Sequence, residues 1–285
     1  FKICAEFILN SRIQFMLFML HSFVSVVLLL IFTLGFTPSQ PVKVEVVTNY
    51  GTMIIQLYDE TPLHRDNFIK LVKNGTYDSL QFHRIIKNFM VQAGDIRSKN
   101  ATLTDTLGGS DLGYRIPAEI VPQHFHKKGA LGAARTNNPE RASSSTQFYI
   151  VQGRVMNDSL LNHNENRINQ FLASHYAVND PENKPLLDSL DAARVAKDSI
   201  LVKELSSKWS LRSKEYSKFE RYQLPEAHRE VYKSIGGSPH LDQNYTVFGE
   251  VISGLDIIDA LAAVPTTQRD RPSTEVRILS MKILP

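Results

Sequence analysis

A single arginine interrupts an apolar stretch that has the composition of a β-strand. Within residues 80–86, the two-residue period of a strand predicts that Arg84 shares one face with three apolar side chains. These are Leu80, Phe82 and Ile86. Either the guanidinium reaches solvent past its apolar neighbours, or it faces a bound molecule.

The strand expected at residues 89–93 adds further chemistry to the same region. Met90 and Gln92 lie two residues apart and therefore share a face, and Phe89 stands at the entry of the strand. With Arg84 they would form an apolar, aromatic-walled depression that holds one guanidinium and one amide. Hydrolysis needs paired carboxylates or a nucleophile beside a base, and this depression has neither. It suits a small apolar ring held next to a polarised peptide bond.

Composition excludes several other classes of function. The chain has 285 residues, of which 42% are hydrophobic and 21% charged, as in an ordinary folded protein. Its 32 basic and 29 acidic residues are too balanced to suggest a nucleic-acid binder. The lone Cys4 excludes an intrachain disulfide and a Cys-rich zinc site. His124 and His126 have a strand spacing, but no third ligand lies close to them in sequence, so no metal is expected.

Residues 1–40 differ from the rest of the chain. No charged residue occurs between Arg12 and Lys43, and Phe, Leu, Val and Ile dominate residues 13–36. Such a stretch is typical of a cleaved secretory signal or of an uncleaved anchor in a bilayer, and both alternatives stay open. In either case we expect export to the periplasm or the exterior, with membrane association through residues 13–36 if the segment is retained.

The remaining residues, 41–285, predict short strands with few helices. Thr61 and Pro62 are expected to cap and begin one helix, which Gly75 ends, and a second helix is expected at 255–262. Strands are expected from 42, at 53–58, 80–86, 89–93, 147–151 and 245–251, and near 276–283. This pattern favours a mainly β fold, a closed antiparallel barrel.

A segment at about 158–235 breaks this pattern. It has almost no strand signal and is rich in Glu, Lys, Asp, Ala, Leu and Ser. We predict two or three amphipathic helices inserted into a loop of the barrel, with another helical start at residues 224–226.

Phe82–Asp95 resembles the signature of the cyclophilin family of peptidyl-prolyl cis–trans isomerases. Further motifs in the order of that family are found at residues 67–68, 74–77, 129–134, 145–150, 241–242 and 247–251. The resemblance covers essentially all of 42–157 and 236–285. It implies an eight-stranded antiparallel β-barrel closed by two helices.

The resemblance also implies a set of site residues. Arg84 matches the catalytic arginine of the family. The substrate-binding positions are matched by Phe89, Met90, Gln92, Ala134, Arg135, Gln147, Tyr149, His240, Leu241 and Tyr245. Four of these depart from the usual residue: His240 replaces a tryptophan, Arg135 an asparagine, Tyr149 a phenylalanine and Tyr245 a histidine. The added hydroxyl of Tyr149 would need a hydrogen-bond partner if buried.

The implied activity is rotation about X–Pro peptide bonds, which would assist the folding of exported proteins without a cofactor. Its partners would be proline-containing unfolded or extended polypeptides. The alternative is a proline-recognising chaperone or scaffold with vestigial catalysis. Because the inserted segment joins the barrel just before His240, it either forms a rim over the substrate groove or points away from it.

Overall fold

The computed structural model describes residues 16, 19, 40–267 and 269–285. The chain separates into two units, residues 1–40 and 41–285, and the fold below is that of the second. Apart from three positions, the expected export segment lies outside the described residues, so its role stays a prediction. No helix among the described residues combines the length and the apolar character needed to span a bilayer.

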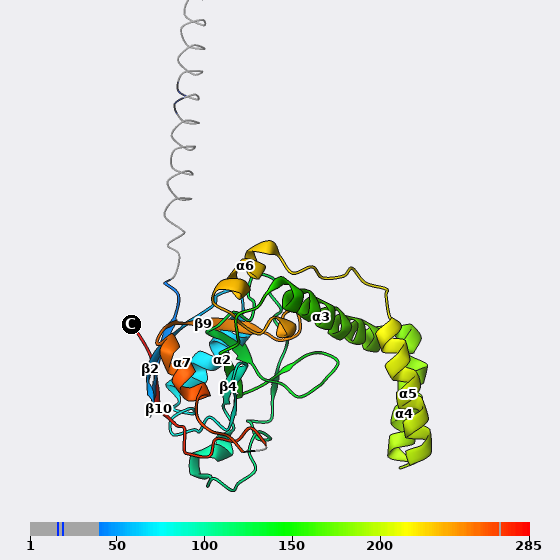
Figure 1. The fold of residues 1–285 in the computed structure, drawn as a ribbon, viewed down its shortest axis with the longest axis horizontal. Helices are drawn as coiled ribbons and strands as arrows, with labels where there is room; N and C mark the ends of the chain where they lie inside the picture. The colour runs from blue at the N-terminus through cyan, green and yellow to red at the C-terminus, as the bar shows by residue number, and fades with distance from the viewer. Residues whose placement is uncertain (1–15, 17–18, 20–39, 268) are drawn as a thin grey trace, which may run out of the picture. The chain divides into compact units, whose positions relative to one another are not determined.

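Eight strands form one antiparallel sheet, in the order β10-β1-β2-β9-β6-β8-β4-β3. Of these, β2, β4, β9 and β10 are labelled in Figure 1. They are β1 (Lys43–Thr48), β2 (Gly51–Leu57), β3 (Arg84–Ile86), β4 (Met90–Ala93), β6 (Ala130–Ala133), β8 (Phe148–Val151), β9 (Val247–Ser253) and β10 (Ile278–Ile283). The short strands β5 (Arg115–Ile116) and β7 (Ser143–Ser144) pair separately.

The sheet curls so far that the segments leading into its two edge strands, β3 and β10, come together. Gln81, just before β3, forms a bridge with Arg277, just before β10, and the amide of Phe82 donates to the carbonyl of Val276 at 2.9 Å. The predicted eight-stranded antiparallel fold is therefore confirmed, in the form of a curled half-barrel.

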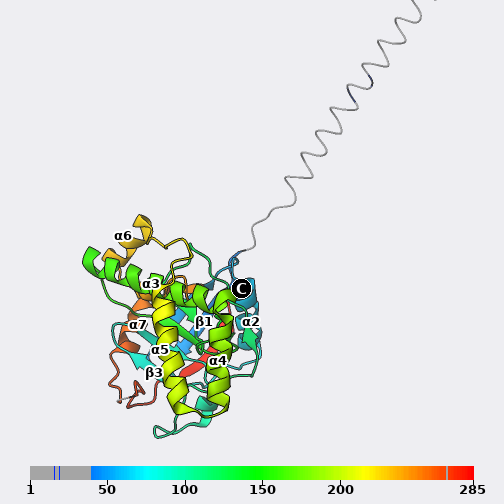
Figure 2. The ribbon, with the colours of Figure 1, turned by 90° about the vertical axis from the view of Figure 1, so that its right-hand side faces the viewer.

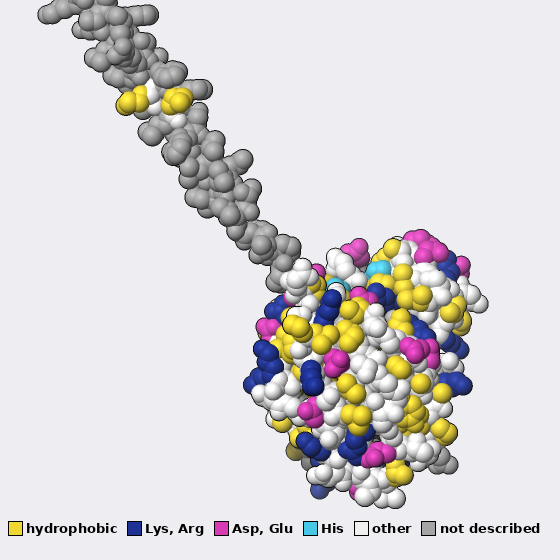
Figure 3. All heavy atoms as spheres, turned by 90° about the vertical axis from the view of Figure 1, so that its left-hand side faces the viewer, with side chains coloured by type: hydrophobic (Ala, Val, Ile, Leu, Met, Phe, Trp, Pro, Cys, Tyr) yellow, Lys and Arg dark blue, Asp and Glu magenta, His cyan; other side chains and the backbone are white. Residues whose placement is uncertain are grey.

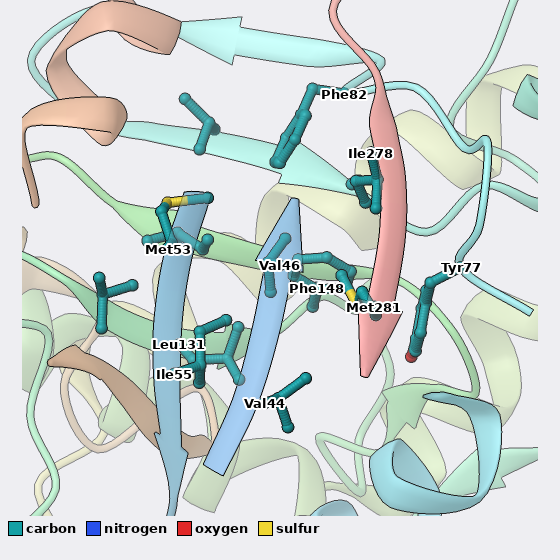
Figure 4. Packing of buried hydrophobic residues seen from close by; sticks show 14 of the residues in the cluster. Val44, Val46, Met53, Ile55, Tyr77, Phe82, Leu131, Phe148, Ile278 and Met281 are labelled. Carbon is teal, nitrogen blue, oxygen red and sulfur yellow. The ribbon is translucent and has the colours of Figure 1, made fainter. Parts of the chain in front are cut away.

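The inner face of the curled sheet carries the main hydrophobic core. Alternate residues of β1 and β2 are fully buried, among them Val44, Val46 and Ile55, and Figure 4 shows them facing Phe148 and Met281. Helices α2 (Pro62–Lys73) and α7 (Leu255–Ala262) cover this core with apolar side chains. Because this core is closely packed, the sheet is a rigid support for the residues on its outer face.

The start of α2 differs from the expectation. Thr61 precedes the helix, but its side chain makes no capping hydrogen bond. The carboxylate of Glu119 instead accepts from the backbone amides of Leu63 and His64, each at 3.0 Å. A carboxylate satisfies two free amides and complements the helix dipole, so it replaces the hydroxyl cap. At the other end Gly75 takes a left-handed conformation with φ 65°, as expected of a helix stop.

The strand expected at 80–86 is shorter than predicted, and the prediction of which side chains share a face with Arg84 was wrong. Leu80 and Phe82 lie in the core and do not share a face with Arg84. The reason is that β3 begins only at Arg84, so residues 82 and 83 break the two-residue period. Ile85 is the β3 residue that enters the core.

The inserted segment contains helices, as predicted. These are α3 (Asp158–Asn179), α4 (Lys184–Val195), α5 (Ser199–Glu215) and α6 (Glu226–Ser234). Of the short 3₁₀ turns, η2 (Pro181–Asn183) lies in this segment, whereas η1 (Ile96–Asn100) and η3 (Pro239–Leu241) lie outside it. Helix α3 leads away from the sheet to α4 and α5, which lie side by side in front of it in Figure 2.

Candidate functional site

Strand register places the candidate residues in one row across the sheet. Arg84 of β3 lies opposite Gln92 of β4, and Gln92 lies opposite Tyr149 of β8. Tyr149 in turn lies opposite Gly132 of β6. Residues directly opposite each other share a face, so these side chains belong to the face that turns away from the core.

Gly132 makes room for the tyrosine in this row. A Cβ atom at that position would stand 2.3 Å from Cζ of Tyr149, far inside van der Waals contact. The absence of a side chain at Gly132 is therefore what lets the tyrosine ring lie flat over β6.

A second apolar cluster, separate from the main core, forms beside this row. It contains most of the residues that the sequence assigned to the proline pocket. Its members include Phe89, Met90, Ala134, Tyr149, Leu241 and Tyr245. They come from β4, β8, the chain after β6 and the η3 region. Met90 and Tyr149 are almost completely buried, whereas Phe89 and Tyr245 are partly exposed at the rim.

The guanidinium of Arg84 is held between an amide and a carboxylate. Its Nη1 donates to Oε1 of Gln92 at 3.4 Å, and its Nε donates to Oδ2 of Asp270 at 3.3 Å. The side chain is 42% exposed, so it is accessible to a ligand. Nη2 makes no hydrogen bond to the residues that the structure describes. A guanidinium has five N–H donors, which leaves several free for a bound amide.

Two further residues hold Gln92 in place. Its Nε2 donates to Oε1 of Gln147 at 3.1 Å, and Nε2 of Gln147 donates to the carbonyls of Gly108 and Ser110 at 3.0 and 3.1 Å. Asp95 fixes the same loop, because its carboxylate accepts from the Gly108 amide at 2.5 Å. This chain of bonds orients the Gln92 carbonyl oxygen towards Arg84.

The hydroxyl of Tyr149 has the buried partner that it needs. It lies 2.9 Å from Nε2 of His126, whose Nδ1 lies 2.8 Å from Oδ1 of Asp242. A carboxylate only accepts, so Nδ1 carries the hydrogen of this bond, and Nε2 shares the second hydrogen bond of the ring with the Tyr149 hydroxyl. Tyr232 of α6 donates to the other oxygen of Asp242 at 2.7 Å. Burial raises the pKa of the Tyr149 phenol well above its usual range, so the phenol stays neutral.

The remaining candidates line the rim of the cluster. The His240 ring lies 5.3 Å from the Phe89 ring, measured between centroids. The Arg135 guanidinium stacks over the Tyr245 ring at 4.5 Å and donates to Oδ1 of Asn244 at 2.9 Å. His240 and Arg135 thus contact the apolar cluster through Phe89 and Tyr245. The chain of Arg84, Gln92 and Gln147 borders the cluster through the register of Gln92 with Tyr149.

Asp270 and the Asp242–His126 pair were not predicted from the sequence. Asp270 lies 186 residues from Arg84 and reaches it because its backbone carbonyl accepts from the Ile85 amide at 2.8 Å. No local pattern signals such a contact. His126 was weighed only as a metal ligand, and its partner is a carboxylate more than a hundred residues away.

Replacing Tyr149 by Phe is expected to destabilise the fold. The variant Tyr149→Phe keeps the ring but leaves Nε2 of the buried His126 without its hydrogen-bond partner, which costs about 1–3 kcal/mol in the free energy of unfolding. Denaturant unfolding measures this loss. Tyr176→Phe on the exposed face of α3 is the control and should change little. An equal effect of the two variants would contradict the assigned hydrogen bond.

His83 is expected to make the protein labile to acid. It is 4% exposed, and neither ring nitrogen bonds to a described residue. Its pKa is lowered from 6.5 to about 4, mainly by burial. The charge of Asp95 acts to raise this pKa, whereas the charges of Arg271 and Arg84 act to lower it. As the pH falls, His83 therefore takes up a proton in the unfolded chain at a higher pH than in the folded chain. The stability contributed by neutral His83 is present above pH 6.5 and is lost as the pH falls towards about 4.

This loss is expected to amount to up to about 3 kcal/mol for His83. Denaturant unfolding of the native chain and of His83→Gln, above and below this pH window, measures it. The variant should lose less stability on acidification than the native chain. An identical loss in both would show that His83 does not titrate in this way.

Comparisons with known proteins agree with this geometry. The family model described as "Cyclophilin type peptidyl-prolyl cis-trans isomerase/CLD" matches residues 43–178 and 227–283. A "Putative peptidyl-prolyl cis-trans isomerase" of Staphylococcus haemolyticus is 28% identical over 85% of this chain and 91% of its own length. A "Putative bifunctional phosphatase/peptidyl-prolyl cis-trans isomerase" of Streptococcus pyogenes is also 28% identical, but the match spans only 38% of that protein.

Solved structures show the same fold. A cyclophilin-type peptidyl-prolyl cis-trans isomerase of Cryptosporidium parvum superposes with a TM-score of 0.51 at 18% identity, covering 86% of this chain and 99% of that one. A second structure of it, in the presence of the dipeptide Ala-Pro, gives a TM-score of 0.50 at 19% identity and covers 85% and 99%. With a family model that matches most of its length, the chain belongs to the cyclophilin-type peptidyl-prolyl cis-trans isomerases.

Proposed function

We propose that this chain isomerises X–Pro bonds in extended or unfolded polypeptides, with Arg84 as the catalytic residue. The observation that carries the proposal is the guanidinium held by Gln92 at the border of an apolar cluster. The proline ring would lie against Phe89, Met90 and Leu241. Its amide would then face the free donors of Arg84.

The chemistry of the X–Pro bond suits this arrangement. Rotation must pass a barrier of about 18–20 kcal/mol, because the planar amide has partial double-bond character. In the twisted state the nitrogen regains its lone pair and can accept a hydrogen bond. A guanidinium that donates to this nitrogen stabilises the twisted state more than either planar state, which is the condition for catalysis.

The site also favours the twisted state through its surroundings. Each tenfold acceleration requires about 1.4 kcal/mol. Hydrogen bonds from a charged donor are stronger than neutral ones, and they strengthen further where apolar side chains exclude water. The cluster beside Arg84 would exclude water from the ring side of the amide, while Gln92 and Asp270 keep the guanidinium in position.

Proline-containing peptides as substrates have support from a relative of the same fold. The Cryptosporidium parvum isomerase was solved in the presence of the dipeptide Ala-Pro. We extend this substrate class to the present chain on the basis of its family and of the apolar cluster beside Arg84.

We further propose that the clients are exported proteins. This rests on the composition of residues 13–36, which is that of a signal or an anchor. Unassisted isomerisation of prolyl bonds takes tens of seconds or longer, which is slow enough to limit the rate of folding.

Removing the guanidinium is expected to abolish most of the activity. Arg84→Ala should lower kcat/KM for an Xaa-Pro peptide by about a hundredfold or more, the usual cost of losing a donor that acts in the transition state. A protease-coupled assay or exchange NMR of the peptide measures this. Arg84→Lys should recover only part of the activity, because it keeps the charge without the planar donor fork.

Arg194→Ala, on the exposed face of α4, is the matched control and should leave turnover unchanged. Full activity of Arg84→Ala would remove Arg84 from the mechanism. Tight binding of the peptide by the native chain without any isomerisation would favour the proline-recognising scaffold instead.

The export proposal predicts where the native protein is found. Intact-mass measurement after cell fractionation should find either a chain shortened by about forty residues outside the cytosol, or a full-length chain in the membrane fraction. A full-length chain in the soluble cytosolic fraction would contradict both forms of the proposal.

A further inference from the structure

The inserted helices form one wall of a large cleft that opens beside the proline cluster. Its volume is about 650 Å³. Arg167, Phe171 and His175 of α3 and Trp209 of α5 line one side of it. His240, Leu241 and Tyr245 line the other, so the cleft is continuous with the apolar cluster. The insertion is thus a rim of the site.

The lining of this cleft is cationic. It contains Arg135, Arg141 and Arg167 and no Asp or Glu. None of the three arginines forms an ion pair with a described residue. A second hollow of about 590 Å³ adjoins it, shares Arg167 and His240, and adds Lys87 and Arg154, again without a carboxylate.

The excess of positive charge is local. The whole chain carries a net charge of only +3. On the side of the molecule away from α4 and α5, basic and acidic side chains are interspersed (Figure 3). Most other basic residues of the insertion are paired, as Lys184 is with Asp188 and Arg194 with Asp191. The clustered arginines repel one another, and an anionic ligand would relieve that repulsion.

The positive charge of the cleft contributes to lowered pKa values of Arg141 and His175. Burial lowers the pKa of Arg141; the nearby Tyr176 opposes this, and the charge of Arg135 lowers the pKa further. Burial also lowers the pKa of His175, as do the charges of Arg141 and Arg135, whereas a hydrogen bond with the backbone of Pro139 raises it. No carboxylate is among the groups that act on either residue.

The cleft walls are also tied to each other. The amide of Asn179, at the end of α3, donates to the carbonyl of Pro139 at 3.3 Å, which links the insertion to the loop that carries Arg135 and Arg141. Arg141 in turn donates to the carbonyl of Gln243 at 2.6 Å. These bonds hold the cations in place before any ligand arrives, which lowers the entropic cost of binding.

We propose that this cleft binds an acidic segment of the polypeptide whose proline occupies the neighbouring cluster. The inference rests on the proposed isomerase function and deepens it: the enzyme selects X–Pro bonds that are flanked by Asp and Glu residues. Polypeptide is favoured as the ligand because the cleft shares His240, Leu241 and Tyr245 with the proline site.

Peptides with one Xaa-Pro core and different flanks test this proposal. A short run of Glu, Gln or Lys is placed on either side of the proline. The native chain is assayed with the run before the proline and with the run after it. On the side where Glu gives the higher kcat/KM, this kcat/KM should be about fivefold or more above that of the Gln peptide, and the kcat/KM of the Lys peptide should be below that of the Gln peptide. The advantage should arise mainly in KM and should shrink at about 1 M salt, where charges are screened.

Trp209 supplies a second readout that does not depend on catalysis. It is the single tryptophan of the chain and lines the cleft, so its emission should change when the cleft is filled. Titration with the Glu-flanked peptide should saturate at a lower concentration than with the Gln-flanked one. A single-stranded oligonucleotide of equal charge should leave the emission unchanged, and an equal or stronger response to it would overturn the choice of polypeptide.

Variants at Arg167 connect these effects to the cleft. Arg167→Gln should remove most of the preference for Glu flanks, and Arg167→Glu should reverse it in favour of Lys flanks. Arg194→Gln, an exposed arginine on α4, is the matched control and should keep the native preference. An unchanged preference in both Arg167 variants, with native circular dichroism, would overturn the proposal.

The two proposals fail in different ways. If the native chain does not isomerise even the Gln-flanked peptide, the isomerase function is wrong. If it isomerises all flanks at equal rates and Trp209 does not distinguish them, the function stands and the acidic specificity of the cleft is wrong.

Discussion

The hydrogen bond from Arg84 to Gln92 is the interaction on which the site depends. A lone guanidinium on a flexible side chain would point into water, where its interactions are weak. Gln92 prevents this because Gln147 orients it and the loop carbonyls of Gly108 and Ser110 orient Gln147. Asp270 holds the guanidinium from the other side. The cation is thereby placed beside an apolar cluster without being buried in it.

The two-residue period of the strands makes this placement possible. Ile85, Val91 and Ile150 lie opposite one another and enter the core, while Arg84, Gln92 and Tyr149 alternate with them on the other face. The packed core therefore fixes the site residues through the backbone they share. Tyr149 adds a second link, since its hydrogen-bonded chain through His126 and Asp242 ends at Tyr232 of the inserted segment.

Local patterns in the sequence were sufficient for most of the fold. The strand signals of β1, β2 and β4, the Gly75 helix stop and the bounds of α7 are short-range features, and the structure has them within two residues of where they were expected. The errors arose where distant residues compete with a local preference. Glu119 displaced Thr61 as the helix cap, and pairing of the chain at Gln81 with Arg277 broke the alternation before Arg84. Asp270 and the Asp242–His126 pair could not be found, because only the tertiary fold brings them together.

A structure of the native chain with an Xaa-Pro peptide tests the central claim most directly. The account predicts the proline ring against Phe89, Met90 and Leu241, with a guanidinium nitrogen of Arg84 within hydrogen-bonding reach of the prolyl amide. A proline ring seated elsewhere, or an Arg84 side chain turned to solvent away from the bound amide, would contradict it.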